Sequence, residues 1–204
     1  MKINILDVTI HQLQNNFCLS KEEEIRVKEL SVKAEKKAIK CIEKRNSRYF
    51  HGEIDPFNSV MNCNYLYWLS HLAFLDGDIS IADKVYYLNK LLNSVELFYE
   101  IELPEIWFCE HPLGSVMGKA KYGNNFFFFQ GCTVGYSPDK EGNIYFPVIG
   151  KDVIMYSNSK ILGNSNIGDH VIISANTYIK NSDIPNNSIV FGQSPNLTIK
   201  NYKN

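Results

Sequence analysis

Residues 149–179, IGKDVIMYSNSKILGNSNIGDHVIISANTYI, repeat an apolar residue at every sixth position. The apolar residues are Ile149, Met155, Ile161, Ile167, Ile173 and Ile179, and a small or β-branched residue follows the first five of them four places later, at Val153, Ser159, Ser165, Val171 and Thr177. A six-residue period fits neither a helix of 3.6 residues per turn nor an alternating strand. It predicts a repeat architecture in which each six-residue unit forms one flat side of a coil and three units close a triangular coil. Stacking of the inward residues then buries one continuous core.

The coil is expected to extend over residues 100–196. Earlier members of the inward frame are Tyr122, Phe128 and Val134. Within the aromatic run 126–129, only Phe128 falls in this frame, and the other rings are expected to pack against helices or a neighbouring subunit rather than a ligand. The repeat decays after Ile179 and is expected to be capped there, and residues 197–204 are expected to form a tail.

One interruption breaks the frame of the coil. Fifteen residues separate Val134 from Ile149, which is not a multiple of six. The intervening segment 136–147 is rich in Pro, Gly, Asn and charged residues, which are typical of turns. We interpret it as a loop expelled from the coil, the kind of protrusion that carries function on a rigid scaffold.

Residues 1–99 are expected to form a helical domain. The predicted helices run over residues 20–44, 58–75 and 80–97. Ser20 followed by Glu23 is typical of a capping box at the start of the first helix, and apolar residues at helical spacing follow it. Ser80 is the predicted N-cap of the third helix.

The composition excludes several classes of protein. The chain has 204 residues, of which 45% are hydrophobic, so a sizeable core can form. Its 21 basic residues nearly balance 22 acidic ones, which gives no field that would attract a nucleic acid. No run approaches the roughly 20 apolar residues of a membrane span. Five scattered cysteines show no paired spacing, and no secretory signal is visible, so a cytoplasmic location is expected.

Two stretches of the coil region carry further motifs. The first reads Glu110-His111-Pro-Leu-Gly-Ser-Val-Met-Gly-Lys-Ala, with Gln130-Gly-Cys-Thr-Val-Gly downstream. The second reads Ser159-Lys-Ile-Leu-Gly-Asn, with Ile173-Ser-Ala-Asn-Thr, Ile184-Pro and Gly192-Gln-Ser-Pro after it. Together they resemble the serine acetyltransferase branch of the hexapeptide-repeat acyltransferases, which has Asp-His-Ala-Thr-Gly-Ile-Val-Ile-Gly and Ala-Lys-Ile-Leu-Gly-Asn at these places. The resemblance implies an α+β fold with an N-terminal α-helical region followed by a left-handed parallel β-helix of hexapeptide repeats.

The resemblance also implies an acetyl-CoA-dependent O-acetyltransferase with His111 as general base. Acetyl transfer from a thioester to a hydroxyl needs a base that takes up a proton near neutral pH, which suits histidine. In the family, an Asp within Val-Asp-Ile-His-Pro precedes the His by one coil and orients it. The similar segment here is Ile101-Glu102-Leu103-Pro104, so Glu102 is the candidate partner. Glu110 matches the Asp beside the family's His and, by resemblance, helps to bind the acceptor.

Acetyl-CoA is the cosubstrate that the resemblance implies. In this family coenzyme A lies in a groove between coils of adjacent subunits, where small residues admit the pantetheine arm. The small residues at matching positions are Ser157, Ser159, Ser174 and Ala175. The same resemblance implies a homotrimer. Small residues at coil corners are also what the fold itself requires.

The acceptor site departs from the family pattern. Serine acetyltransferases have an Arg-His pair just before the coil resumes, and Tyr145-Phe146 stands in that place here. The guanidinium that would bind an α-carboxylate is therefore absent, whereas an aromatic pair is suited to packing against a sugar face. The leading hypothesis is O-acetylation of a sugar in surface polysaccharide biosynthesis. A genuine serine O-acetyltransferase of cysteine biosynthesis and a catalytically silent β-helix scaffold protein are the alternatives.

A metal centre is not expected. Carbonic anhydrases that share this fold bind their metal through three converging histidines. The coil region contains only His111 and His170.

Overall fold

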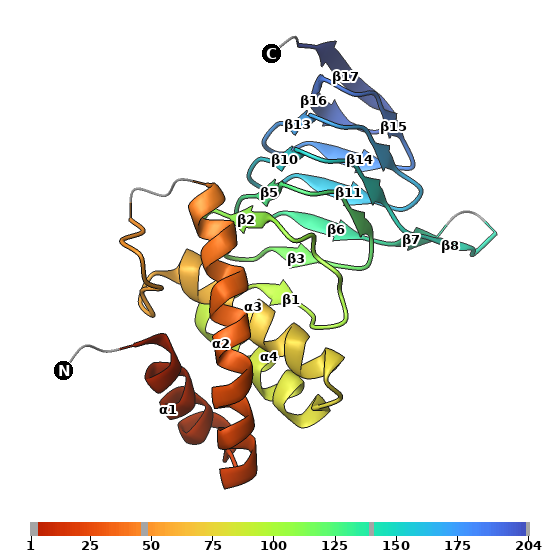
Figure 1. The fold of residues 1–204 in the computed structure, drawn as a ribbon. Coiled ribbons are helices and arrows are strands. Elements are labelled where there is room, and N and C mark those ends of the chain that lie inside the picture. Colours follow the sequence, from red (N-terminus) through yellow and green to blue (C-terminus); the bar gives the residue numbers. More distant parts are fainter. Residues whose placement is uncertain (1–3, 46–48, 139–140, 203–204) are drawn as a thin grey trace. The chain divides into compact units, whose positions relative to one another are not determined.

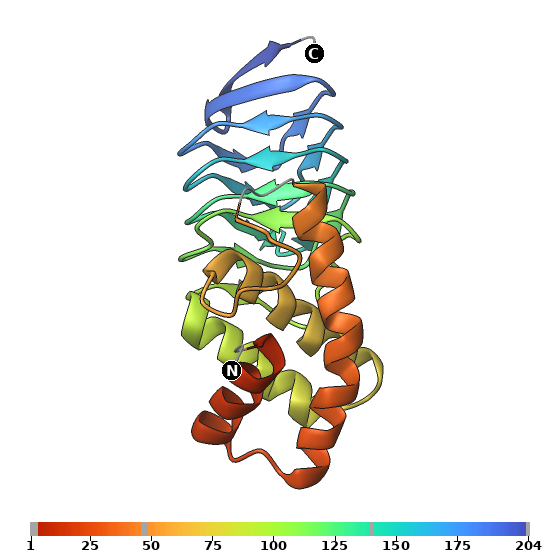
Figure 2. The same cartoon turned by 60° about the vertical axis from the view of Figure 1, so that its left-hand side comes forward.

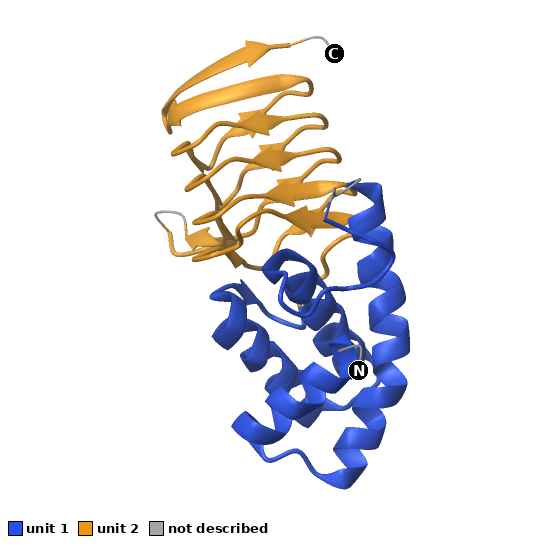
Figure 3. Ribbon diagram, turned by 90° about the vertical axis from the view of Figure 1, so that its left-hand side faces the viewer, with its two compact units in different colours: residues 1–100 blue, residues 101–204 orange. Residues whose placement is uncertain are grey.

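A computed structural model describes residues 4–45, 49–138 and 141–202 of the chain. The chain divides into two compact units, residues 1–100 and 101–204 (Figure 3). Unit 1 is helical, and unit 2 is a coil of short parallel strands (Figure 1). The predicted fold class, a helical region followed by a parallel β-helix of hexapeptide repeats, is confirmed.

Unit 2 has three faces, each made of strands that stack from one coil to the next (Figure 2). The first face contains β2 (Trp107–Cys109), β5 (Phe126–Phe128), β10 (Ile154–Met155) and β13 (Ile172–Ile173). The second contains β3 (Val116–Met117), β6 (Thr133–Gly135), β11 (Lys160–Leu162) and β14 (Tyr178–Lys180). The third contains β4 (Lys121–Tyr122), β9 (Val148–Ile149), β12 (Asn166–Ile167) and β15 (Asp183–Ile184). The last coil is formed by β16 (Ser188–Gln193), which pairs with both β13 and β14 and so joins the first two faces.

The predicted inward frame is confirmed by the pairing register. Phe128 lies beside Met155, and Met155 lies beside Ile173, so the same inward position recurs on the first face. All six residues that define the period are at most 3% exposed. The small or β-branched residues that follow them four places later are buried as well, because they lie at the corners of the triangle with their side chains directed inward. Burial of each large apolar side chain contributes roughly 1.5–3 kcal/mol, so this stack is the main stabilising feature of the unit.

The expelled segment forms a β-hairpin in its described part. β7 (Ser137–Pro138) pairs antiparallel with β8 (Ile144–Tyr145), and residues 139–140 lie outside the described part. The hairpin explains the break in the period: Phe127 pairs with a residue 27 positions later, Ile154, whereas Ile154 pairs with Ile172 after 18. The coil therefore continues in register past an insertion of nine residues.

Two details of the coil differ from expectation. Phe126 is fully buried like Phe128, because alternate residues of a strand point to the same side. The region predicted as a tail is a strand over most of its length: β17 (Asn196–Asn201) pairs antiparallel with β16, and residues 203–204 lie outside the described part. This hairpin covers the edge that the last coil would otherwise expose.

The described residues of unit 1 form four helices and a short strand. They are α1 (Ile5–Phe17), α2 (Lys21–Lys44), α3 (Ser59–Leu75), α4 (Ile79–Asn93) and β1 (Glu96–Leu97). Helix α3 packs against both α2 and α4 and is buried on nearly all sides, as its high apolar content requires. In the described part of the chain, no helix has the length and apolar character needed to cross a membrane.

The helices agree with the sequence except at three places, the first of which is the end of α4 at Asn93 rather than at Leu97, because Ser94 adopts a left-handed conformation and Glu96–Leu97 form β1. The capping box at Ser20 is confirmed, and α3 covers the predicted range. Helix α4 begins one residue before Ser80, with Asp78 as the N-cap residue. Helix α1 was missed, although Asn4 accepts a hydrogen bond from the backbone N–H of Asp7 in the usual N-cap arrangement. Asn4, a residue type favoured at N-caps, was the signal in the sequence that could have predicted this helix.

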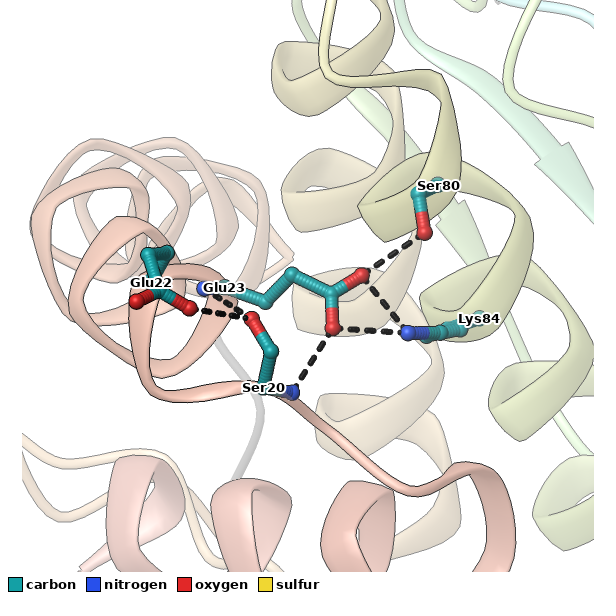
Figure 4. A network of polar contacts seen from close by, with 5 residues as sticks. All are labelled: Ser20, Glu22, Glu23, Ser80 and Lys84. Atoms are coloured by element: carbon teal, nitrogen blue, oxygen red, sulfur yellow. Dashed lines mark hydrogen bonds and ion pairs between the residues drawn. The ribbon is translucent and has the colours of Figure 1, made fainter.

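The capping box of α2 also anchors α4 (Figure 4). Glu23 accepts a hydrogen bond from the backbone N–H of Ser20 at 2.8 Å, and Lys84 of α4 donates to both of its carboxylate oxygens at 2.6 and 2.7 Å. Ser80, the predicted N-cap, donates its hydroxyl to the same carboxylate at 2.7 Å. These donors stabilise the carboxylate form and lower the pKa of Glu23 from 4.5 to about 2.

We expect Glu23→Gln to reduce the free energy of unfolding by about 1–2 kcal/mol at pH 7, because the substitution removes an ion pair and weakens a cap. The depressed pKa of Glu23 contributes stability that is present above the unfolded value of 4.5 and is lost as the pH falls toward 2. Urea unfolding between pH 7 and pH 2 measures both effects. Glu22→Gln is the matched control, because Glu22 lies in the same first turn and accepts a hydrogen bond from the Ser20 hydroxyl at 3.0 Å but, within the described residues, none from α4. An unchanged pH dependence in Glu23→Gln would contradict this account.

Candidate active site

The turns that join the first face to the second stack into one corner of the triangle, which we call the His111 corner. Backbone hydrogen bonds align its residues from coil to coil in two neighbouring columns. One column contains Glu110, Phe129, Tyr156 and Ser174. The other contains His111, Gln130, Ser157 and Ala175. Residues from four coils, far apart in the sequence, thus form a single ridge.

His111 lies at the first coil of this corner and projects into solvent. Its side chain is 70% exposed, and its backbone has a φ of 48°. The left-handed conformation that recurs at this corner falls on Gly114, Gly131, Asn158 and Asn176, whereas the residues aligned with His111 do not adopt it, so the conformation of His111 belongs to the longer first turn. Buried Ser115 holds the turn in place: its hydroxyl donates to the carbonyl of Phe129 at 2.9 Å and accepts from the N–H of Cys132 at 3.2 Å. A rigid turn therefore presents an accessible imidazole.

The nearest carboxylate to His111 is that of Glu110. Nε2 of His111 lies 3.9 Å from Oε1 of Glu110. Glu102, the candidate partner from the sequence, is exposed, and within the described residues no hydrogen bond or ion pair joins it to His111. The structure therefore brings together His111 and Glu110, but not His111 and Glu102.

Glu96 is a carboxylate that the sequence reasoning passed over. Val95-Glu96-Leu97 matches Val-Asp-Ile at least as well as Ile101-Glu102-Leu103 does, and Glu96 precedes His111 by 15 residues. The first coil pairs Cys109 with Phe128, a step of 19 residues, so Glu96 is closer than Glu102 to a full coil before the histidine. Its carboxylate accepts a hydrogen bond from Lys90 at 2.7 Å. Coil length was the signal that could have found it.

Three of the four small residues assigned to coenzyme A lie on the surface of the His111 corner. Ser157 and Ser174 are half-buried, and Ala175 is exposed. Within the described residues, the backbone N–H groups of Ser157 and Ala175 have no intramolecular acceptor, so both can donate to a ligand. Ser159 differs, because it is fully buried beside the thiol of Cys132, with 3.6 Å between Oγ and Sγ. Its side chain belongs to the core rather than to a surface groove.

Tyr145 and Phe146 lie at a different corner, where the hairpin leaves the coil. Both are a little under 40% exposed. The ring of Phe146 meets the edge of Tyr136 at 6.3 Å, and Nζ of Lys119 lies 5.1 Å from its centre. Phe146 is thus engaged by an aromatic edge and a cation from its own chain.

His170 lies at the third corner. Its Nδ1 is 3.3 Å from Oδ2 of Asp152, which also accepts a hydrogen bond from Asn125 through its other oxygen. These contacts between corner side chains of successive coils give His170 a structural role. In the residues that the structure describes, no group of three or more His, Cys, Asp or Glu side chains could hold a metal ion.

The stacked faces and the six-residue period define a hexapeptide-repeat β-helix. Residues 146–181 match the model of the bacterial transferase hexapeptide, six repeats. The chain is similar to a serine acetyltransferase of Staphylococcus xylosus, with 33% identity over 125 residues, which cover 61% of this chain and 57% of that relative. The recognition of a serine acetyltransferase-like hexapeptide-repeat chain is therefore confirmed. The chain spans just under three fifths of the length of the curated relatives it matches first.

Solved serine acetyltransferases share the fold. The structure from Neisseria gonorrhoeae superimposes with a TM-score of 0.73 at 22% identity, covering 100% of this chain and 82% of that chain. The enzyme from Brucella abortus strain S19 in complex with coenzyme A gives a TM-score of 0.73 at 17% identity, covering 100% and 84%. The likeness extends over the helices as well as the coil.

We expect a thiol reagent to label about one cysteine of the five in the native protein. Cys18 is exposed and the other four are buried, and burial raises the pKa of the Cys132 thiol, which lowers its thiolate fraction further. Spectrophotometric titration should show that Cys18→Ser removes the fast reaction, whereas unfolded protein reacts at all sites. Fast labelling of Cys132 in the native state would mean that the corner opens readily.

Proposed function

We propose that this protein is an acetyl-CoA-dependent O-acetyltransferase of the serine acetyltransferase type. The observation that carries the proposal is the His111 corner, where an exposed imidazole lies at one end of a ridge that includes the small residues Ser157, Ser174 and Ala175. Relatives at about 30% identity are serine acetyltransferases, and a protein of the same fold is known with coenzyme A bound. The motif around Glu110 and His111 supports the same reaction.

His111 serves as the general base in this proposal. It takes the proton from the acceptor hydroxyl while the oxygen bonds to the acetyl carbon, and it returns the proton to the thiol as the carbon–sulfur bond breaks. Coenzyme A supplies the thioester when bound. The free N–H groups of Ser157 and Ala175 suit the carbonyl oxygens of a pantetheine arm, and the small side chains of these two residues leave room for it.

A carboxylate is needed to orient the imidazole. Glu110 is nearest in the structure, whereas Glu102 keeps the role proposed from the sequence and Glu96 fits the coil spacing. The three single Gln variants separate these candidates, because loss of the orienting carboxylate lowers kcat, whereas loss of an acceptor contact raises the KM for the acceptor.

A sugar hydroxyl of a surface polysaccharide precursor is the proposed acceptor. The support is the substitution of Tyr145-Phe146 for the Arg-His pair, which removes the cation that would bind an amino-acid carboxylate. The resemblance implies a homotrimer with coenzyme A between adjacent subunits, and we propose that assembly for this chain. The names of the relatives favour the second candidate, O-acetylation of serine.

We expect His111→Ala to lower the rate of acetyl transfer by about 10²- to 10⁴-fold, the usual contribution of a positioned base. Thiol release from acetyl-CoA, measured in the Cys18→Ser background, gives the rate, and calorimetry should show unchanged binding of coenzyme A. His170→Ala is the matched control, because that histidine lies at another corner. Full activity of His111→Ala would refute the mechanism. A wild-type protein that does not bind coenzyme A would instead support the scaffold alternative.

We expect turnover with a sugar or nucleotide sugar and little with L-serine, because Tyr145-Phe146 replaces the Arg-His pair whose guanidinium would hold the α-carboxylate. A panel of acceptors at equal concentration, with acetyl-CoA saturating, measures this preference. Efficient turnover of L-serine would overturn the sugar proposal and leave the acetyltransferase proposal intact.

A further inference from the structure

Two aromatic rings stack on the His111 corner itself. Phe129 and Tyr156 lie in adjacent coils with ring centres 5.0 Å apart and planes inclined by only 13°. They occupy the column that begins with Glu110, directly beside the column that begins with His111. Tyr156 is 40% exposed, so an accessible aromatic surface exists next to the candidate base.

This aromatic pair is held rigidly. The N–H of Phe129 donates to the carbonyl of Met155 at 3.0 Å, and the N–H of Tyr156 donates to that of Ile173 at 2.9 Å. The carbonyl of Tyr156 accepts from the N–H of Ser159 at 3.1 Å and from the Cys132 thiol at 3.2 Å. A binding surface built on fixed backbone loses little entropy when a ligand binds.

The spacing of the coils sets the distance from the base to this surface. Parallel strands lie about 4.8 Å apart, so Phe129 is one coil from the level of His111, and Tyr156 is two. A single pyranose ring spans about one such step. A sugar ring packed on Tyr156 leaves about one further step to the level of the base, and a second ring of the acceptor spans that step and brings its hydroxyl to the imidazole.

The side chains around the pair suit a carbohydrate. Gln130 and Ser157 accompany it in the neighbouring column and offer amide and hydroxyl groups, and Oε1 of Gln130 is buried without a hydrogen-bond partner in the described residues. The hydroxyl of Tyr156 likewise has no partner there. Aromatic faces carry negative charge and attract the C–H groups on the flat side of a sugar, and polar groups at the margin fix its orientation.

We propose that Tyr156, backed by the nearly parallel ring of Phe129, forms the platform on which a sugar ring of the acceptor packs, which makes these two specificity-determining residues. This inference rests on the proposed function. It assigns the sugar to the corner that bears the base in the same chain, whereas Phe146 is engaged by Tyr136 and Lys119 at another corner. The adenine of coenzyme A is a poorer occupant, because it lies at the opposite end of that molecule from the thiol, which must approach His111.

Steady-state kinetics with the best sugar acceptor test the platform. We expect Tyr156→Ala to raise the KM for the acceptor about 3- to 10-fold with little change in kcat, which corresponds to the usual range for an aromatic contact. Tyr156→Phe should remain within about twofold of wild type, because it keeps the stacking face. Phe191→Ala is the matched control: Phe191 is also 40% exposed and lies in the same column, separated from Tyr156 by Ser174. Binding of coenzyme A should be unchanged in all three.

Three results would overturn the platform. The first is an unchanged KM for the acceptor in Tyr156→Ala. The second is an increase in this KM only in Tyr145→Ala or Phe146→Ala. The third is a mass of Tyr156→Ala by light scattering that differs from that of the wild type, which would make the rings a contact between subunits. If the wild type transfers no acetyl group to any sugar, the proposed function fails separately. Saturation-transfer NMR with the same sugars then decides the platform: binding that Tyr156→Ala abolishes supports it, and sugar binding that is absent or indifferent to Tyr156 refutes it.

Discussion

The stacking of inward apolar side chains from coil to coil is the constraint on which the rest of unit 2 depends. Apart from β16 and β17, each described strand of the unit has only two or three residues and could not persist alone. Parallel backbone pairing stabilises the strands together, and so does the burial of one apolar side chain from each six-residue repeat. Met155, for example, lies between Phe128 of the coil before and Ile173 of the coil after. Because every coil must present an apolar residue at the same three places, the strands stay in register and differences in coil length are confined to the corners.

The same constraint leaves the corners free to vary. A corner residue needs only a backbone conformation that turns the chain, and its side chain can point outward. The insertion of nine residues at one corner shows how much can be accommodated, because Val134 and Ile161 remain paired across it. At the His111 corner the variation takes the form of side chains: a histidine, a glutamate and two stacked aromatic rings project from turns that the core holds rigid. A solenoid thus separates the part that stabilises from the part that can recognise a ligand.

Polar contacts have a comparable role within unit 1. Glu23 lies at the first turn of α2, and its carboxylate binds the backbone of its own helix and two side chains of α4. A local motif that could be read from the sequence as a capping box is therefore also a tertiary contact. The lowered pKa of Glu23 reflects both roles.

The sequence by itself determined the coil, its inward residues, the expelled segment, the capping box of α2 and the candidate base His111. These depend on local periodicity and on short motifs, which do not need a partner distant in the chain. Only the tertiary structure decided that Ser159 points inward, that Glu110 rather than Glu102 lies beside His111, and that Tyr156 stacks on Phe129. Each of these depends on which residues of successive coils become neighbours. The register varies with the number of residues in every turn. Paired residues of successive coils on the first face are therefore 17, 18, 19 or 27 positions apart in the sequence. The length of each turn decides the neighbours, and a six-residue period carries no information about it.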